Sequence, residues 1–142
     1  MTASSSLETD TDDAQLRVDL AAAFRLAARF DLHESVANHF SAAISSDGKR
    51  FLCNPKWRHF SLVRASELVL LDADNPSSMD RPDAPDPSAW CIHGAIHSRI
   101  ASARAVLHCH PPYATTLCAL EDPRIPPLDQ ATARFWGRTV YD

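Results

Sequence analysis

Hydrophobic positions near the start of the chain repeat with the period of an α-helix. Leu16, Leu20 and Phe24 recur every four residues, in a segment rich in Ala, Leu and Arg, which are good helix formers. Acidic residues directly before this repeat suit the positive end of a helix dipole. We therefore expect the first helix over residues 12–32.

Three short apolar runs follow the first helix and are predicted to be β-strands. They cover residues 35–45, 49–55 and 66–74. Asp47 and Gly48 lie between the first two runs, and an Asp-Gly pair in this position is typical of a tight hairpin turn. We therefore expect the first two strands to pair antiparallel.

The second half of the chain predicts another helix and another strand. Ile92, Ile96 and Ile100 recur every four residues, so residues 87–100 are predicted to form a helix with one buried isoleucine stripe. Residues 103–109 are predicted to form a buried strand. This order of helix, antiparallel strands, helix and strand indicates an α/β fold with a mainly antiparallel sheet covered by helices.

Composition and charge narrow the classes of function. The chain has 142 residues, 45% of them apolar, so we expect one domain over residues 14–142 and, before it, a polar, acidic and disordered leader over residues 1–13. The formal net charge is −4 and no basic cluster is present, which argues against a nucleic-acid partner. No apolar run approaches the ~20 residues of a membrane span, and the start of the chain lacks the features of a signal peptide. We expect a cytoplasmic protein that does not bind membranes.

Several common catalytic motifs are missing. The four cysteines fit neither a metal-binding pair nor a small disulfide framework, and we expect them to be reduced. The chain has no GxSxG nucleophile elbow, no GxGxxG loop and no P-loop. The histidines are therefore the main candidates for chemistry.

Two histidines stand two residues apart at the end of the last predicted strand. Because side chains two apart share one face of a strand, His108 and His110 present two imidazoles side by side. The other face carries Ala105, Leu107 and Cys109 and suits the core. A divalent metal could bind the two imidazoles, but a catalytic zinc usually takes three protein ligands. The spacing alone is also compatible with an ordinary strand end.

A second pair of histidines is four residues apart on a predicted helix. His93 and His97 therefore lie on one helix face and could chelate a metal, but their place beside the isoleucine stripe favours a packing or supporting role. His39 lies near a strand end. His33 and His59 have no partner visible in the sequence, and we expect them at the surface or in loops.

Four segments, in this order, resemble the class II aldolase/adducin family. They are "DLHESVANHFSAAI", "FLCNP" followed by "ASELVLLD", "IHGAIHSRIASARAVLHCHPPYA", and "LDQATARFWGRTVYD". The resemblance runs from about Leu16 to the last residue. It implies a three-layer α/β/α sandwich with a central, mainly antiparallel sheet, here shortened at its C-terminus. It also implies a homo-oligomer, a tetramer in most of the family's enzymes, with sites at subunit interfaces.

The resemblance also implies a chemistry. His108 and His110 would be two of three ligands of zinc or another divalent metal. Such a metal would stabilise the enediolate that forms when a small hydroxy-carbonyl substrate loses a proton or when its C–C bond breaks. The expected activity is that of an aldehyde-lyase. His39, Asn54 and Lys56 are the expected substrate contacts.

The chain departs from the family pattern at three places. Ala89 stands where the family's aldolases carry an acid/base glutamate, and His93 or Tyr113 is a candidate to replace it. The third metal-binding histidine of the family would come after the last residue. Lys56 and the two residues after it replace a glycine-containing phosphate loop, which argues against a sugar-phosphate substrate.

These departures leave three interpretations open. The first is a metal-dependent, class II aldolase-like lyase whose activity depends on a substitute for the missing glutamate. The second is a non-catalytic, adducin-like domain that serves self-association or protein binding. The third is a truncated pseudo-enzyme with neither role.

Overall fold

A computed structural model describes residues 5–141 of the chain, with side chains from residue 13 onward. The chain forms two compact units, Met1–His110 and Pro111–Asp142, which are described separately. The boundaries predicted from the sequence, with a leader over residues 1–13 and a domain over residues 14–142, stay predictions. Residues 1–4, at the start of that leader, lie outside the described residues.

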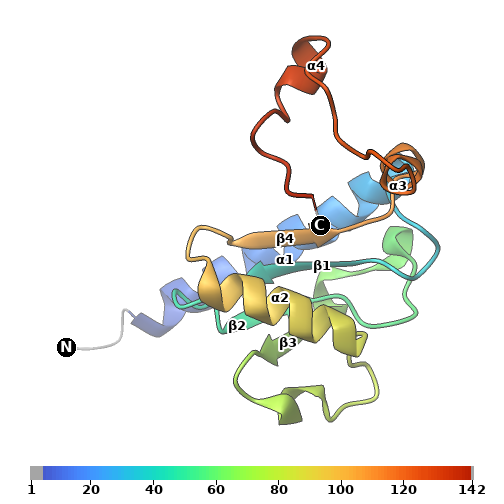
Figure 1. Ribbon diagram of the computed structural model, residues 1–142. Helices are drawn as coiled ribbons and strands as arrows, with labels where there is room; N and C mark the ends of the chain where they lie inside the picture. Colours follow the sequence, from blue (N-terminus) through green and yellow to red (C-terminus); the bar gives the residue numbers. More distant parts are fainter. Residues whose placement is uncertain (1–4, 142) are drawn as a thin grey trace. The chain divides into compact units, whose positions relative to one another are not determined.

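A four-stranded sheet forms the centre of the first unit. Its strands are β1 (His39–Ala43), β2 (Arg50–Cys53), β3 (Val69–Asp72) and β4 (Ala105–His108). They lie in the order β3-β2-β1-β4, and each neighbouring pair is antiparallel (Figure 1). The predicted hairpin and the mainly antiparallel sheet of an α/β fold are therefore confirmed.

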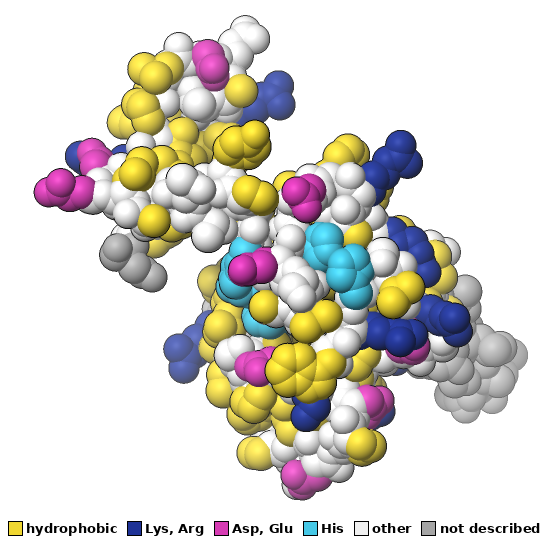
Figure 2. All heavy atoms as spheres, turned by 90° about the vertical axis from the view of Figure 1, so that its right-hand side faces the viewer, with side chains coloured by type: hydrophobic (Ala, Val, Ile, Leu, Met, Phe, Trp, Pro, Cys, Tyr) yellow, Lys and Arg dark blue, Asp and Glu magenta, His cyan; other side chains and the backbone are white. Residues whose placement is uncertain are grey.

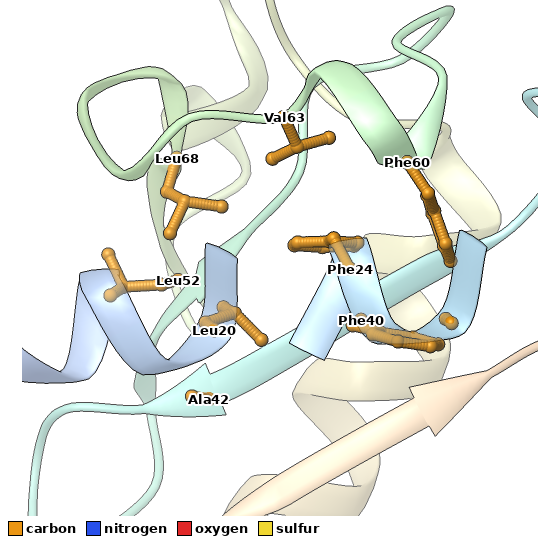
Figure 3. Close-up of a cluster of buried hydrophobic side chains, with 9 residues drawn as sticks. Leu20, Phe24, Phe40, Ala42, Leu52, Phe60, Val63 and Leu68 are labelled. Carbon is orange, nitrogen blue, oxygen red and sulfur yellow. The ribbon is translucent and has the colours of Figure 1, made fainter. Parts of the chain in front are cut away.

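Helix α1 (Ser5–Arg29) packs against one face of this sheet. Phe24 on the helix stacks on Phe40 of β1 with ring centroids 5.0 Å apart, and it meets the edge of Phe60 at 4.7 Å. Figure 3 shows these rings beside the aliphatic side chains of the same cluster. The helix begins at Ser5, earlier than the apolar repeat predicts, and ends at Arg29, before the predicted end at residue 32.

Helix α2 (Pro87–Arg99) packs against the opposite face. The side chain of Asp86 caps its first turn by accepting a hydrogen bond from the backbone N–H of Ser88. The apolar cluster between the helix and the sheet consists of Ala43, Phe51, Cys53, Val69, Leu71 and, from the helix itself, Ala89. Helices thus lie on both faces of the sheet, and the complete three-layer sandwich of the family stays a prediction.

The predicted burial of the isoleucine stripe on α2 is wrong. Ile92 and Ile100 are 44% and 51% exposed, and Ile96 is half-buried. The buried face instead carries Ala89, His93, Gly94 and His97. Because successive residues are about 100° apart around a helix, a shift of one position turns the whole stripe away from the sheet.

The predicted burial of strand β4 is also wrong. Its residues alternate between exposed and half-buried, and Leu107 is 56% exposed. The strand lies at the edge of the four-stranded sheet, while the core under α1 is centred on β1 and β2. Cys109, just after the strand, is half-buried against this core.

The hairpin turn between β1 and β2 is held against the end of α2. Gly48 has φ 75°, and a Cβ atom on it would come within 2.0 Å of the carbonyl oxygen of His97. Only glycine avoids both the backbone cost and this collision. The turn therefore fixes where the last turn of α2 lies over the sheet.

Short helices complete the chain. Three 3₁₀ helices, Phe60–Leu62, Ala65–Glu67 and Pro76–Met79, lie in the first unit. Two short α-helices, α3 (Pro112–Cys118) and α4 (Gln130–Ala133), belong to the second unit.

All four cysteines are free; Cys53 is buried, and burial raises the pKa of its thiol to about 12. Among the described residues, no helix is both long and apolar enough to cross a membrane.

Candidate metal and histidine site

Five histidines gather where β1, β4 and α2 meet. The β1–β4 register places His39 directly opposite His108, and the two rings stack with centroids 4.4 Å apart. His93 comes from α2 and also meets His39. Figure 2 shows histidine side chains reaching the surface of the molecule beside acidic side chains. The fold therefore assembles residues that are up to 71 positions apart (39 to 110) in the sequence.

His108 and His110 turn the same ring nitrogen toward each other. Their Nε2 atoms are 3.0 Å apart. The Nδ1 atom of His110 lies 2.7 Å from a carboxylate oxygen of Glu34. Because a carboxylate only accepts, a neutral His110 carries its proton on Nδ1 and has a lone pair on Nε2.

This arrangement fits two ligands of a divalent metal. Two imidazoles on one tetrahedral zinc, with Zn–N distances of 2.0–2.1 Å, hold their nitrogens about 3.3 Å apart. A carboxylate on the other ring nitrogen is the usual second contact of a metal-binding histidine. In the part of the chain that the structure describes, however, no group of three His, Cys, Asp or Glu side chains forms a metal site. The described residues therefore include a candidate pair of ligands, His108 and His110, and not a complete set.

The other histidines form a buried chain of hydrogen bonds. Nδ1 of His97 lies 2.6 Å from the carbonyl oxygen of Ala103, and its Nε2 lies 2.7 Å from the hydroxyl of Ser41. The same hydroxyl bonds Nδ1 of His93. Nε2 of His93 then lies 2.7 Å from Nδ1 of His39. His93 and His97, which the sequence interpreted as packing or supporting groups, are joined through this chain to His39, which stacks on His108.

Burial is the main cause that lowers the pKa values of these histidines. It lowers the pKa of His93 to about 3, with a contribution from the neighbouring His39. It lowers the pKa of His39 to about 4, with a contribution from His108. The pKa values of His97 and His108 are lowered too, again chiefly by burial. These four imidazoles are neutral near pH 7, and neutral imidazole can accept hydrogen bonds or bind metals.

Ala89 and Asn54 both lie in the interior. Ala89, at the position of the family's glutamate, is fully buried in the apolar cluster under α2. The side-chain oxygen of Asn54 accepts the backbone N–H of Phe40 at 3.1 Å, and its amide donates to the carbonyl of Asn38 at 3.3 Å. Asn54 therefore holds the backbone at the start of β1 through two hydrogen bonds, and its expected contact with substrate stays a prediction.

Lys56 and Tyr113 lie on the surface. Lys56 is exposed, and its charge helps to lower the pKa of the Asp86 carboxyl, which is lowered chiefly by hydrogen bonds from Ser88. The next residue, Trp57, is 73% exposed and has φ 62°, in the left-handed region that most residues avoid. Tyr113 is 92% exposed on α3, in the second unit. The predicted roles of Lys56 and Tyr113 stay predictions.

The sequence interpretation missed two features of the site and one contact outside it. Ser41 had a signal, because it stands two residues after His39 and so shares its face of β1. Glu34 had none, because it lies in an irregular loop far along the chain from His110. His33 and His59, expected without partners, bond each other through their Nε2 atoms at 2.8 Å.

Comparison with known proteins agrees with these observations. The family model described as Class II Aldolase and Adducin N-terminal domain matches residues 18–141. The chain belongs to this family. The resemblance inferred from the order of the motifs is thereby confirmed.

Relatives of the chain in this family include proteins named as class 2 aldolases and proteins named as adducins. A Pseudomonas aeruginosa protein, named as a candidate class 2 aldolase, is 36% identical over 116 residues, which cover 78% of this chain and 44% of that protein. Alpha-adducin of Rattus norvegicus is 27% identical over 97% of this chain and 19% of its own length. The crystal structure of an aldolase II superfamily protein from Pseudomonas syringae matches with a TM-score of 0.77 and 32% identity, covering 89% of this chain and 51% of that one. The chain thus spans about half the length, or less, of these relatives.

Proposed function

We propose that the chain forms the amino-terminal part of a metal-dependent, class II aldolase-like lyase. The reaction would make or break a C–C bond next to a hydroxy-carbonyl group in a small substrate. The observation that carries this proposal is the convergence of the two Nε2 atoms of His108 and His110, 3.0 Å apart, with Glu34 behind His110. Family membership supports the same chemistry.

Each residue of the site has a proposed role. His108 and His110 hold zinc or another divalent metal, and Glu34 orients the ring of His110 through its Nδ1 proton. When bound, the metal supplies Lewis-acid stabilisation of the negative charge that develops on the substrate oxygens. His39, stacked on His108, and the exposed Lys56 contact the substrate, and Asn54 supports this edge of the site.

Proton transfer needs a substitute for the family's glutamate. A positioned general base contributes about 10²–10⁴-fold to a rate, and the buried methyl group of Ala89 cannot serve. His93 is fully buried and acts through His39, which it bonds. Tyr113 is the alternative donor and acceptor that the sequence offers.

The assembly belongs to the same proposal. We expect the complete three-layer α/β/α domain to form a homo-oligomer, a tetramer as in most of the family's enzymes, in the cytoplasm. In such an assembly, a neighbouring chain would supply ligands that the described residues lack.

Metal analysis of the purified protein tests this function. We expect about one zinc ion per chain after purification without chelators, and loss of that zinc in His108→Ala and His110→Ala. The variant His59→Ala is the matched control, because His59 bonds His33 and Ser61 and not the proposed ligands. The proposal would be refuted by wild-type protein that is folded, as judged by its circular dichroism spectrum, but binds no zinc even when zinc is added.

A non-catalytic, adducin-like domain is the second candidate function. The fully buried Ala89, at a position that needs a reactive carboxylate in the family's aldolases, favours it. This alternative predicts a stable oligomer without metal and no turnover of a panel of hydroxy-ketones and hydroxy-aldehydes. Turnover that disappears in His110→Ala would exclude it.

A further inference from the structure

We propose that Ser41 and His97 are positioning residues for His39. Acting through His93, they hold His39 as its Nδ1–H tautomer, so that its Nε2 atom is left as an acceptor for a substrate hydroxyl group. That Nε2 of His39 accepts from a substrate hydroxyl group rests on the proposed function, whereas its tautomer follows from the hydrogen bonds alone.

The direction of the hydrogen-bond chain is set at its buried end. The carbonyl oxygen of Ala103 can only accept, so Nδ1 of His97 carries the proton in the 2.6 Å bond between them. A neutral His97 then has a lone pair on Nε2. That atom must accept the hydroxyl proton of Ser41, 2.7 Å away.

Each following bond is directed by the one before it. The hydroxyl of Ser41 has one proton, which it gives to His97, so it accepts from His93 and the Nδ1 atom of His93 is the donor. The Nε2 atom of His93 is then a lone pair. It accepts from Nδ1 of His39 in the 2.7 Å bond that joins the two rings.

The chain cannot serve as a path for protons to solvent at its inner end. It stops at a backbone carbonyl, which does not take up a proton under these conditions. Ser41, His93 and His97 are at most 2% exposed, so water does not compete for their hydrogen bonds. The function left to the chain is to hold one orientation and one tautomer.

The free end of the chain lies next to His108 of the candidate site. Nε2 of His39 has no hydrogen-bond partner among the described residues, and it is not one of the ring nitrogens sealed from solvent. Its ring stacks on His108 with centroids 4.4 Å apart. A hydroxyl group of a molecule bound beside His108 and His110 can therefore donate to a lone pair of fixed orientation.

Long-range ¹H–¹⁵N NMR of histidine side chains tests the tautomers directly. Spectra are recorded at pH 7.5 in a chelator, on the full chain labelled with ¹⁵N in its histidines. Even an imidazole of ordinary pKa is mostly neutral at this pH. We expect His39, His93 and His97 all to be Nδ1–H tautomers, which are the minor form of free neutral histidine. A wild-type His39 in the Nε2–H form overturns the proposal, whatever the variants do.

Variants at Ser41 distinguish an effect on the direction of the hydrogen bonds from an effect on the packing of the side chains. In Ser41→Ala, we expect His39 and His93 to lose the pure Nδ1–H form, while His97 keeps it because Ala103 still accepts. Ser41→Thr retains a hydroxyl and should restore the wild-type pattern. The control Ser98→Ala removes a hydroxyl that bonds only within α2, and it should change none of the three. An unchanged His39 tautomer in a folded Ser41→Ala protein overturns the proposal.

This result is independent of the proposed function. Metal-free protein with the predicted tautomers would refute the lyase but leave the positioning intact. Protein that binds zinc at His108 and His110 but shows the Nε2–H form of His39 would refute the positioning role and leave the proposed function intact.

Discussion

Acid should unfold this protein through its buried neutral histidines before its carboxylates are affected. His93 is fully buried and bonded on both ring nitrogens, and burial lowers its pKa to about 3 from an ordinary value of 6.5. The unfolded chain therefore binds a proton at this residue over a pH range in which the folded chain does not. Stability is complete above about pH 6.5 and is lost as the pH falls from there toward 3.

The magnitude follows from the linkage between protonation and folding. At pH 5.0, 1.5 units below the ordinary pKa of histidine, protonation of His93 favours the unfolded chain by about 2 kcal/mol. His39, whose pKa is lowered to about 4, adds a loss of similar size. We therefore expect the free energy of unfolding to fall by about 4 kcal/mol between pH 7.5 and pH 5.0. Folding free energies of single domains are only about 5–15 kcal/mol, so this loss is large.

Urea denaturation at the two pH values measures this effect. Trp90 is a suitable reporter in the first unit, because its indole N–H donates to the carbonyl of Asp72 at 3.0 Å. A chelator is present throughout, so that metal binding does not contribute. His93→Gln lowers stability at pH 7.5 but should reduce the pH-dependent loss by about 2 kcal/mol. His59→Gln, outside the buried chain of hydrogen bonds, should leave that loss unchanged.

One outcome would refute this reasoning. Equal free energies of unfolding at pH 7.5 and pH 5.0 would mean that His93 and His39 take up protons in the folded protein as readily as in the unfolded one. In that case burial would not keep the two rings neutral, and the proposed direction of the hydrogen bonds would lose its basis at low pH.

Other substitutions test separate parts of the structure. Gly48→Ala should cost about 2 kcal/mol or more in urea denaturation, since its Cβ would meet the backbone of His97; Gly137→Ala, with a similar φ but open space, is the control and should cost less. Phe24→Ala removes a fully buried ring and should cost about 3–5 kcal/mol; a loss below 1 kcal/mol would contradict the core assignment. Glu34→Gln should weaken zinc binding about 10–100-fold in competition with a chelator, and unchanged affinity would remove Glu34 from the site. Ala89→Glu should cost on the order of 3 kcal/mol, and a neutral effect would show that this position can hold a carboxylate.

Much of the local structure could be predicted from short-range patterns. The Asp-Gly turn between two apolar runs predicts the β1–β2 hairpin. The apolar repeat in α1 identifies Leu20 and Phe24, both of which are buried in the core. These predictions succeed because turn chemistry and side-chain periodicity act over a few residues.

The orientation of α2 could not be predicted in the same way. Its isoleucines and its histidines repeat with the same spacing, so the hydrophobic pattern selected the isoleucines for the core. The structure buries His93 and His97 instead, because Ser41, His39 and the carbonyl of Ala103 satisfy their ring nitrogens. A buried polar group loses its cost only when such partners are in place, and those partners come from other elements.

The candidate site, too, could be predicted from the sequence only in part. The sequence by itself determined the family, through the order of its motifs, and the closeness of the His108 and His110 rings, through the two-residue period of a strand. Only the tertiary structure decided that Glu34, 76 positions away from His110, bonds its Nδ1 atom, and that His39 stacks on His108. Neither contact has a local pattern, since each depends on a strand register or a loop path that is set by the packing of the whole sheet.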